Sequence, residues 1–82
     1  MDVEVKLYGV LRRYRPVSAG GAPHHPFSMT VAATATPATL AAHLGIPDGL
    51  VNAAAVNSES VAADTPLQDG DQVSLFPAAA GG

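Results

Sequence analysis

The 82-residue sequence contains no cysteine and no tryptophan, and only four of its residues are basic. The absence of cysteine excludes disulfide bonds, thiolate metal ligands and cysteine nucleophiles. The four basic residues are outnumbered by seven acidic ones, and the formal net charge is −3. Nucleic-acid-binding proteins usually carry a broad basic face that neutralises several phosphates, so we expect no nucleic-acid partner.

Long apolar runs are also missing. No segment approaches the roughly 20 apolar residues that span a bilayer. The opening MDVEVKLYG alternates charged and apolar residues, which is not typical of a signal peptide. These features predict a cytoplasmic protein with no membrane partner.

Aromatic side chains are scarce: Tyr8, Tyr14, Phe27 and Phe76. A chain of this length forms one domain with a small core, here an aliphatic one. Such a core leaves little room for an enclosed active site. We therefore expect a binding or carrier module rather than a self-contained enzyme, with a single domain over residues 1–82 and a flexible tail over 77–82.

Strand patterns occupy both ends of the chain. In DVEVKLY, Val3, Val5 and Leu7 alternate with polar residues, which predicts a half-buried strand. FSMTVAA resumes the alternation after a long loop rich in Pro, Gly and His, near residues 16–26, which we expect to be mobile. NAAAVNSESV predicts a strand leading into a tight turn, and the last strand follows a turn at DGD, with Val73 and Leu75 facing inward.

The segment TPATLAAHLGIP predicts the main helix. Thr36 suits the N-cap and Pro37 the first helical position. Gly45 fits the position after the C-cap, and Pro47 prevents continuation. Two strands, a helix and two more short strands predict an α+β roll. In it, one helix packs across a mixed sheet whose first and last strands are parallel neighbours, as in the β-grasp fold.

Three segments, VEVKLYGVLRRY, LAAHLGIP and PLQDGDQVSLFPAAAGG, resemble in order the MoaD/ThiS family of ubiquitin-like sulfur carriers. The final DGDQVSLFPAAAGG is the most specific of them. The KLYGVLRRY opening and the LFP before the tail are more similar to MoaD, the small subunit of molybdopterin synthase, than to ThiS. Two features depart from the family: Ala78 replaces a frequent second proline, and the HHP-containing loop is unusually long.

The resemblance implies that Gly82 is the working residue. A terminal carboxylate is ionised at neutral pH and is a poor electrophile, so a partner must first adenylate it before sulfur can convert it to a thiocarboxylate. Gly81 lacks a side chain, which lets the tail enter a narrow pocket in the partner. The sequence has no GxxxxGK[ST] loop, so we expect the partner to bind the ATP and this chain to hold no cofactor.

The implied partners are an adenylyltransferase similar to MoeB, MoaB or ThiF, the large subunit of molybdopterin synthase, and a sulfur donor such as a cysteine desulfurase or rhodanese. Three alternatives stay open. The chain could carry sulfur for thiamine or another metabolite, or modify proteins by conjugation of Gly82 to lysines. It could also be an interaction domain whose tail has no role.

Phe76 is the second candidate functional residue. Strand alternation directs its side chain away from Leu75 and the core, onto an open face that Tyr8 shares if the first and last strands are parallel neighbours. The resemblance implies that Phe76 packs on the partner, with Pro77 and Tyr8 beside it. The alternative is that Phe76 covers an edge of the small core.

Other polar residues offer weaker sites. His24 and His25 are adjacent, and His43 is distant in sequence, so their spacing does not predict a metal site. Arg12, Arg13 and Arg15 are expected in an exposed turn, where they could meet an acidic partner surface. Asp69, Gly70 and Asp71 are interpreted as turn residues.

Overall fold

The computed structural model describes residues 1–78. Within that range the chain forms five strands, one α-helix and two 3₁₀ helices. In chain order the elements are β1 (Asp2–Leu7), η1 (Gly9–Tyr14), η2 (Val17–Ala19), β2 (Phe27–Thr30), α1 (Pro37–His43), β3 (Val51–Val56), β4 (Glu59–Val61) and β5 (Gln72–Pro77).

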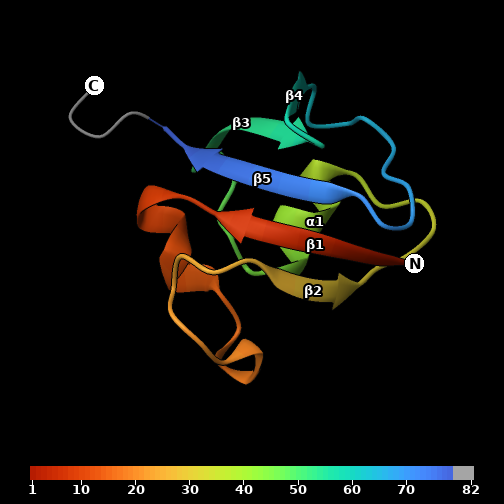
Figure 1. Cartoon of the computed structure of the whole chain (residues 1–82). Helices are drawn as coiled ribbons and strands as arrows, with labels where there is room; N and C mark the ends of the chain where they lie inside the picture. Colours follow the sequence, from red (N-terminus) through yellow and green to blue (C-terminus); the bar gives the residue numbers. More distant parts are fainter. Residues whose placement is uncertain (79–82) are drawn as a thin grey trace.

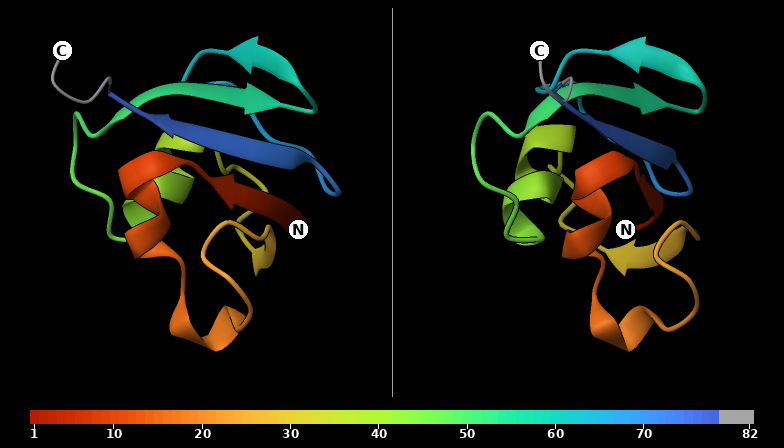
Figure 2. Two further views of the ribbon diagram at one scale, coloured as in Figure 1. Left: turned by 60° about the vertical axis from the view of Figure 1, so that its left-hand side comes forward. Right: turned by 90° about the vertical axis from the view of Figure 1, so that its left-hand side faces the viewer.

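The strands form one sheet in the order β2-β1-β5-β3-β4. Neighbours are antiparallel except β1 and β5, which run parallel with Leu7 opposite Leu75. The helix α1 covers one face of the sheet, and Figure 1 views the opposite, open face. Figure 2 shows the same two layers from the side. This arrangement is the predicted β-grasp fold.

The core lies between the sheet and α1. Alternate residues of β1 and β5 point into it, as the sequence pattern predicted. On the helix side they meet Leu40 and Ala41, which share one face of α1. The buried apolar residues are Val3, Val5, Leu7, Leu11, Phe27, Ala35, Leu40, Ala41, Ile46, Ala54, Leu67, Val73 and Leu75.

Both ends of α1 match the sequence signals. The Thr36 Oγ1 accepts a hydrogen bond from the Thr39 backbone N–H at 3.2 Å, and the Thr39 Oγ1 accepts one from the Thr36 N–H at 2.8 Å. This reciprocal cap satisfies two of the free amides at the helix start. Gly45 adopts φ = 80° just after the C-cap Leu44, a conformation that favours glycine.

The sheet has one strand more than the sequence predicted. Val56 pairs with Glu59 in an antiparallel hairpin. The two connecting residues, Asn57 and Ser58, both have positive φ, at 51° and 72°, as a type I′ turn requires. The turn was predicted, but the three-residue strand β4 after it is too short to show an alternating pattern.

The turn before β5 is held by side chains, which confirms its residues as turn formers. One Asp69 carboxylate oxygen accepts the Asp2 N–H at 2.7 Å. The Asp71 carboxylate accepts the Gln68 N–H at 2.8 Å and the Asn57 side-chain amide at 3.0 Å. These bonds fix the end of the sheet where β1 and β5 begin.

The loop that follows η1 is organised around Arg15. Its guanidinium donates to the carbonyl oxygens of Gly20 and His25 and lies 5.5 Å from the centre of the Phe27 ring. The expectation that Arg15 belongs to an exposed turn was therefore wrong, because its side chain is half-buried and bonded within the loop. Arg12 and Arg13 are exposed as expected. The predicted mobility of this loop stays a prediction.

Candidate functional site

An aromatic pair marks the open face where β5 ends. Tyr8 follows β1 in register with Phe76, because Leu7 lies opposite Leu75 and the Tyr8 N–H donates to the Leu75 carbonyl at 3.1 Å. The two rings stack with centroids 4.5 Å apart and an angle of 22° between their planes. Both side chains are half-buried on the face away from the core. The predicted placement of Phe76 and Tyr8 on one face is confirmed.

The other neighbours of the pair leave it accessible. Phe76 lies opposite Ala53 of β3, whose side chain is too small to cover the ring. The Lys6 ammonium lies 5.2 Å from the centre of the Tyr8 ring, a distance at which a cation is attracted to the aromatic face. The result is an apolar surface with one positive charge beside it. We call Tyr8, Ala53 and Phe76 the aromatic patch.

The chain leaves the sheet directly beside this patch. Pro77 is the last residue of β5 and pairs with Val51 of β3, and the Ala78 N–H donates to the Leu50 carbonyl at 3.1 Å. The sequence placed the start of the tail at Pro77, whereas the structure extends the strand through that residue because β3 still offers it a partner. The predicted flexibility of the tail falls mainly on residues 79–82, which lie outside the described residues.

Gly81 and Gly82, the predicted reactive residues, lie outside the described residues. The structure places their point of departure: the end of β5, next to Phe76 and at the same end of the molecule as η1 (Figure 1). The described part of the chain therefore ends directly beside the aromatic patch.

Two residues that sequence reasoning missed border this surface. Gly9 has φ = 55° and lies against the ring of Pro77. Val10 is the second residue of η1, which contacts β5, and its side chain is 53% exposed. The one local signal for Gly9 was its position directly after a predicted strand. Its contact with Pro77 cannot be predicted until the register between β1 and β5 is known.

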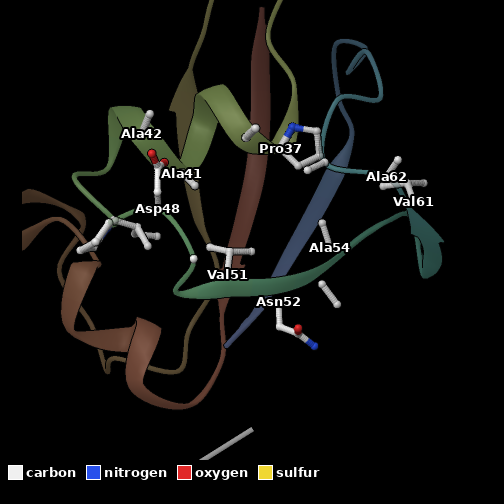
Figure 3. A pocket seen from close by; sticks show the side chains of 15 residues that line it. Pro37, Ala41, Ala42, Asp48, Val51, Asn52, Ala54, Val61 and Ala62 are labelled. Atoms are coloured by element: carbon white, nitrogen blue, oxygen red, sulfur yellow. The ribbon is translucent and has the colours of Figure 1, made fainter. Parts of the chain in front are cut away.

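A separate hollow lies between α1 and β3. It has a volume of about 350 Å³ and opens on the helix side of the sheet. In Figure 3, Pro37 and Ala41 of α1 face Val51 and Ala54 of β3 across it. Among residues 1–78, Asp48 is the one ionisable side chain that lines it, so it lacks the paired groups of an acid–base site.

The three histidines are exposed and lie in two places. His24 and His25 meet edge to face in the loop before β2, with ring centroids 4.6 Å apart, whereas His43 ends α1. No cluster of three potential metal ligands occurs within residues 1–78. In the same part of the chain, no helix has the length and apolar character needed to cross a membrane.

Comparison with known proteins places this geometry in a family. The model of the ThiS family matches residues 26–82, whereas a search of curated protein sequences gave no match. Subunit 1 in a complex of subunits 1 and 2 of molybdopterin-converting factor from Helicobacter pylori is 31% identical, with a TM-score of 0.58 over 100% of both chains.

Two further structures share the fold. SAMP1 from Haloferax volcanii has a TM-score of 0.64 and 22% identity over 100% of both chains. A Pyrococcus furiosus protein described as molybdopterin converting factor subunit 1 has a TM-score of 0.63 and 22% identity, over 93% of this chain and 95% of its own. The ThiS match covers more than half of the chain, including all of β2 to β5. The chain therefore belongs to the MoaD/ThiS family of sulfur carriers with a ubiquitin-like fold.

Proposed function

We propose that this chain carries sulfur as a C-terminal thiocarboxylate on Gly82 and delivers it for molybdopterin synthesis. The observation that carries the proposal is the aromatic patch at the root of the tail: Phe76 and Tyr8 stack at 4.5 Å on the open face, directly before the chain leaves the sheet. Further support comes from the Helicobacter pylori subunit 1, which is similar over the whole chain and is found in complex with subunit 2.

The chemistry proceeds in two steps on the carboxyl group of Gly82. In the first, a carboxylate oxygen attacks the α-phosphorus of ATP bound by the partner, and pyrophosphate leaves. In the second, a hydrosulfide-equivalent nucleophile attacks the carbonyl carbon, the bond to the AMP oxygen breaks, and AMP leaves with its electron pair. The product is a thiocarboxylate, and no oxidant or reductant is needed when the sulfur arrives as hydrosulfide.

The aromatic patch supplies the docking energy for these steps. Interfaces are commonly anchored by a few aromatic residues that become fully desolvated on binding. Here the stack holds the Phe76 ring in place before the partner arrives, so little side-chain entropy is lost on docking. Docking on this face brings the tail to the partner end first.

The alternative pathways use the same activated carboxyl group. A thiamine pathway would transfer the sulfur to a thiazole precursor, and a protein modifier would transfer the glycyl group to a lysine amine. The MoaD-like opening KLYGVLRRY and the subunit 1 relatives favour molybdopterin. Sulfur transfer that occurs with a molybdopterin synthase large subunit, and not with a thiazole synthase, distinguishes the molybdopterin pathway from the thiamine pathway.

The activation step is tested by ATP–pyrophosphate exchange. The purified chain is incubated with an adenylyltransferase of the MoeB or ThiF type from the same source, with ATP and labelled pyrophosphate. We expect label to enter ATP only when the chain is present. Absence of exchange with every such enzyme of that source would refute the proposal.

Charge near the tail is expected to affect the rate of docking. Arg12 and Arg13 are exposed on η1, at the tail end of the molecule. Replacing either by Gln should slow association with the partner on the order of threefold at low ionic strength, with a smaller effect in high salt. The control Gln68→Glu changes the net charge equally at the opposite end and should leave the rate unchanged. Equal effects at both ends, measured by stopped-flow binding, would contradict this assignment.

A further inference from the structure

The root of the tail is held between two loops that are far apart in sequence. Beyond the end of β1 at Leu7, Pro77 has no strand beside it on that side. The turn at Gly9 takes this place. A Cβ atom built on Gly9 would lie 2.9 Å from the Pro77 Cγ and 3.6 Å from its Cδ.

On the other side, the loop before β3 holds the next residue. The Ala78 N–H donates to the Leu50 carbonyl at 3.1 Å. Pro77 has a fixed φ and no N–H of its own, so the direction of the chain at this point depends on the packing of its ring and on the bond of Ala78. A Cβ on Gly9 would collide with the Pro77 ring, and a displaced ring would shift the Ala78 amide that follows it.

The remaining reach of the chain makes this direction important. Four residues follow Ala78, and at roughly 3.3–3.6 Å each they extend at most about 14 Å. The position and direction of Ala78 therefore limit which points the Gly82 carboxylate can reach while the aromatic patch is docked. Misplacement of a reacting group by about 1 Å can reduce a rate on the order of 100-fold.

We infer that Gly9 is a positioning residue, which seats the Pro77 ring and so aims the tail into the partner's active site. This inference rests on the proposed function. Gly9→Ala should force the Pro77 ring away, release the Ala78 amide from Leu50 and slow adenylation while leaving the aromatic patch in place. Because docking is retained, we expect kcat to fall about tenfold or more and KM to change less than about threefold.

The matched control is Gly70→Ala. Gly70 also has a positive φ, at 85°, but no atom lies within 4 Å of a Cβ at that position. It is in the turn before β5, at the opposite end of the strand from Pro77. Both substitutions strain the backbone in the left-handed region, so a difference between them reports the contact with Pro77.

Hydrogen exchange of the Ala78 amide gives a readout that does not need the partner. We expect exchange to be about tenfold or more faster in Gly9→Ala than in Gly70→Ala, with equal protection of the core strands. Pro77→Ala removes the other partner of this contact, the ring, without straining the backbone, and should also speed exchange at Ala78. In the Pro77→Ala background, Gly9→Ala should reduce the protection of the Ala78 amide no more than Gly70→Ala does.

Each outcome decides the inference. Equal exchange and equal kcat in Gly9→Ala and Gly70→Ala would overturn it, as would independent effects of Gly9→Ala and Pro77→Ala. Faster exchange of the Ala78 amide in Gly9→Ala with an unchanged kcat would also overturn it, because the direction of the tail would then not affect adenylation. If the wild-type chain is never adenylated, the proposed function fails, and hydrogen exchange still decides whether Gly9 positions Ala78.

Discussion

Deleting Gly82, or adding one alanine after it, is expected to abolish adenylation and sulfur uptake. The deletion withdraws the carboxylate by about 3.5 Å, the length of one extended residue. The addition replaces the reactive carboxyl group by an amide carbonyl, which ATP cannot activate. Because a misplacement of about 1 Å can cost on the order of 100-fold in rate, we expect both variants to lose at least that much.

The control for this experiment keeps the length of the chain. Ala80→Gly leaves the carboxylate on Gly82 and should be activated within about threefold of the wild-type rate. Rates are measured by pyrophosphate exchange, and folding is checked by thermal melts, which we expect to be unchanged because residues 79–82 follow the last strand. Activation of the lengthened chain at the wild-type rate, without proteolytic trimming, would contradict the assignment of Gly82.

Leu75→Ala and Phe76→Ala are expected to have opposite effects on folding and docking. Leu75 is completely buried between the sheet and α1, so its truncation should cost about 2–5 kcal/mol of folding free energy by leaving a cavity. Phe76→Ala removes an aromatic pair on the open face and should cost about 1 kcal/mol of stability. It should weaken docking to the partner by about 2 kcal/mol or more, as truncation of an interface aromatic does.

Thermal melts and partner titrations on both variants separate the two roles. For Leu75→Ala, affinity per folded molecule should equal that of the wild type. If Phe76→Ala instead unfolds the domain and leaves that affinity intact, Phe76 is a core residue, and the aromatic patch is not a docking surface.

Local patterns carried most of the fold prediction. The alternation in β1 and β5 specifies which side chains are buried, because in a strand neighbouring residues point to opposite faces. Thr36, Pro37 and Gly45 mark the ends of α1 through bonds and backbone angles within a few residues of each other. Such signals need no knowledge of the rest of the chain.

The missed features depend on contacts between distant segments. Arg15 was interpreted as exposed. Its bonds to the carbonyls of Gly20 and His25 depend on the path of the loop, and the loop sequence has no periodic pattern from which that path can be predicted. The contact of Gly9 with Pro77 requires β1 and β5 to be parallel neighbours in a specific register. The pairing of Phe76 with Tyr8 was predictable because that same topology had been inferred.

The most direct test of the sulfur-carrier assignment is the location of sulfur in the activated protein. The chain is incubated with its adenylyltransferase, ATP and hydrosulfide, and its mass is measured intact and after fragmentation. We predict a gain equal to the mass difference between one sulfur and one oxygen atom, carried by the fragment that contains Gly82. An unchanged mass despite adenylation, or a gain on any fragment without Gly82, would contradict the assignment.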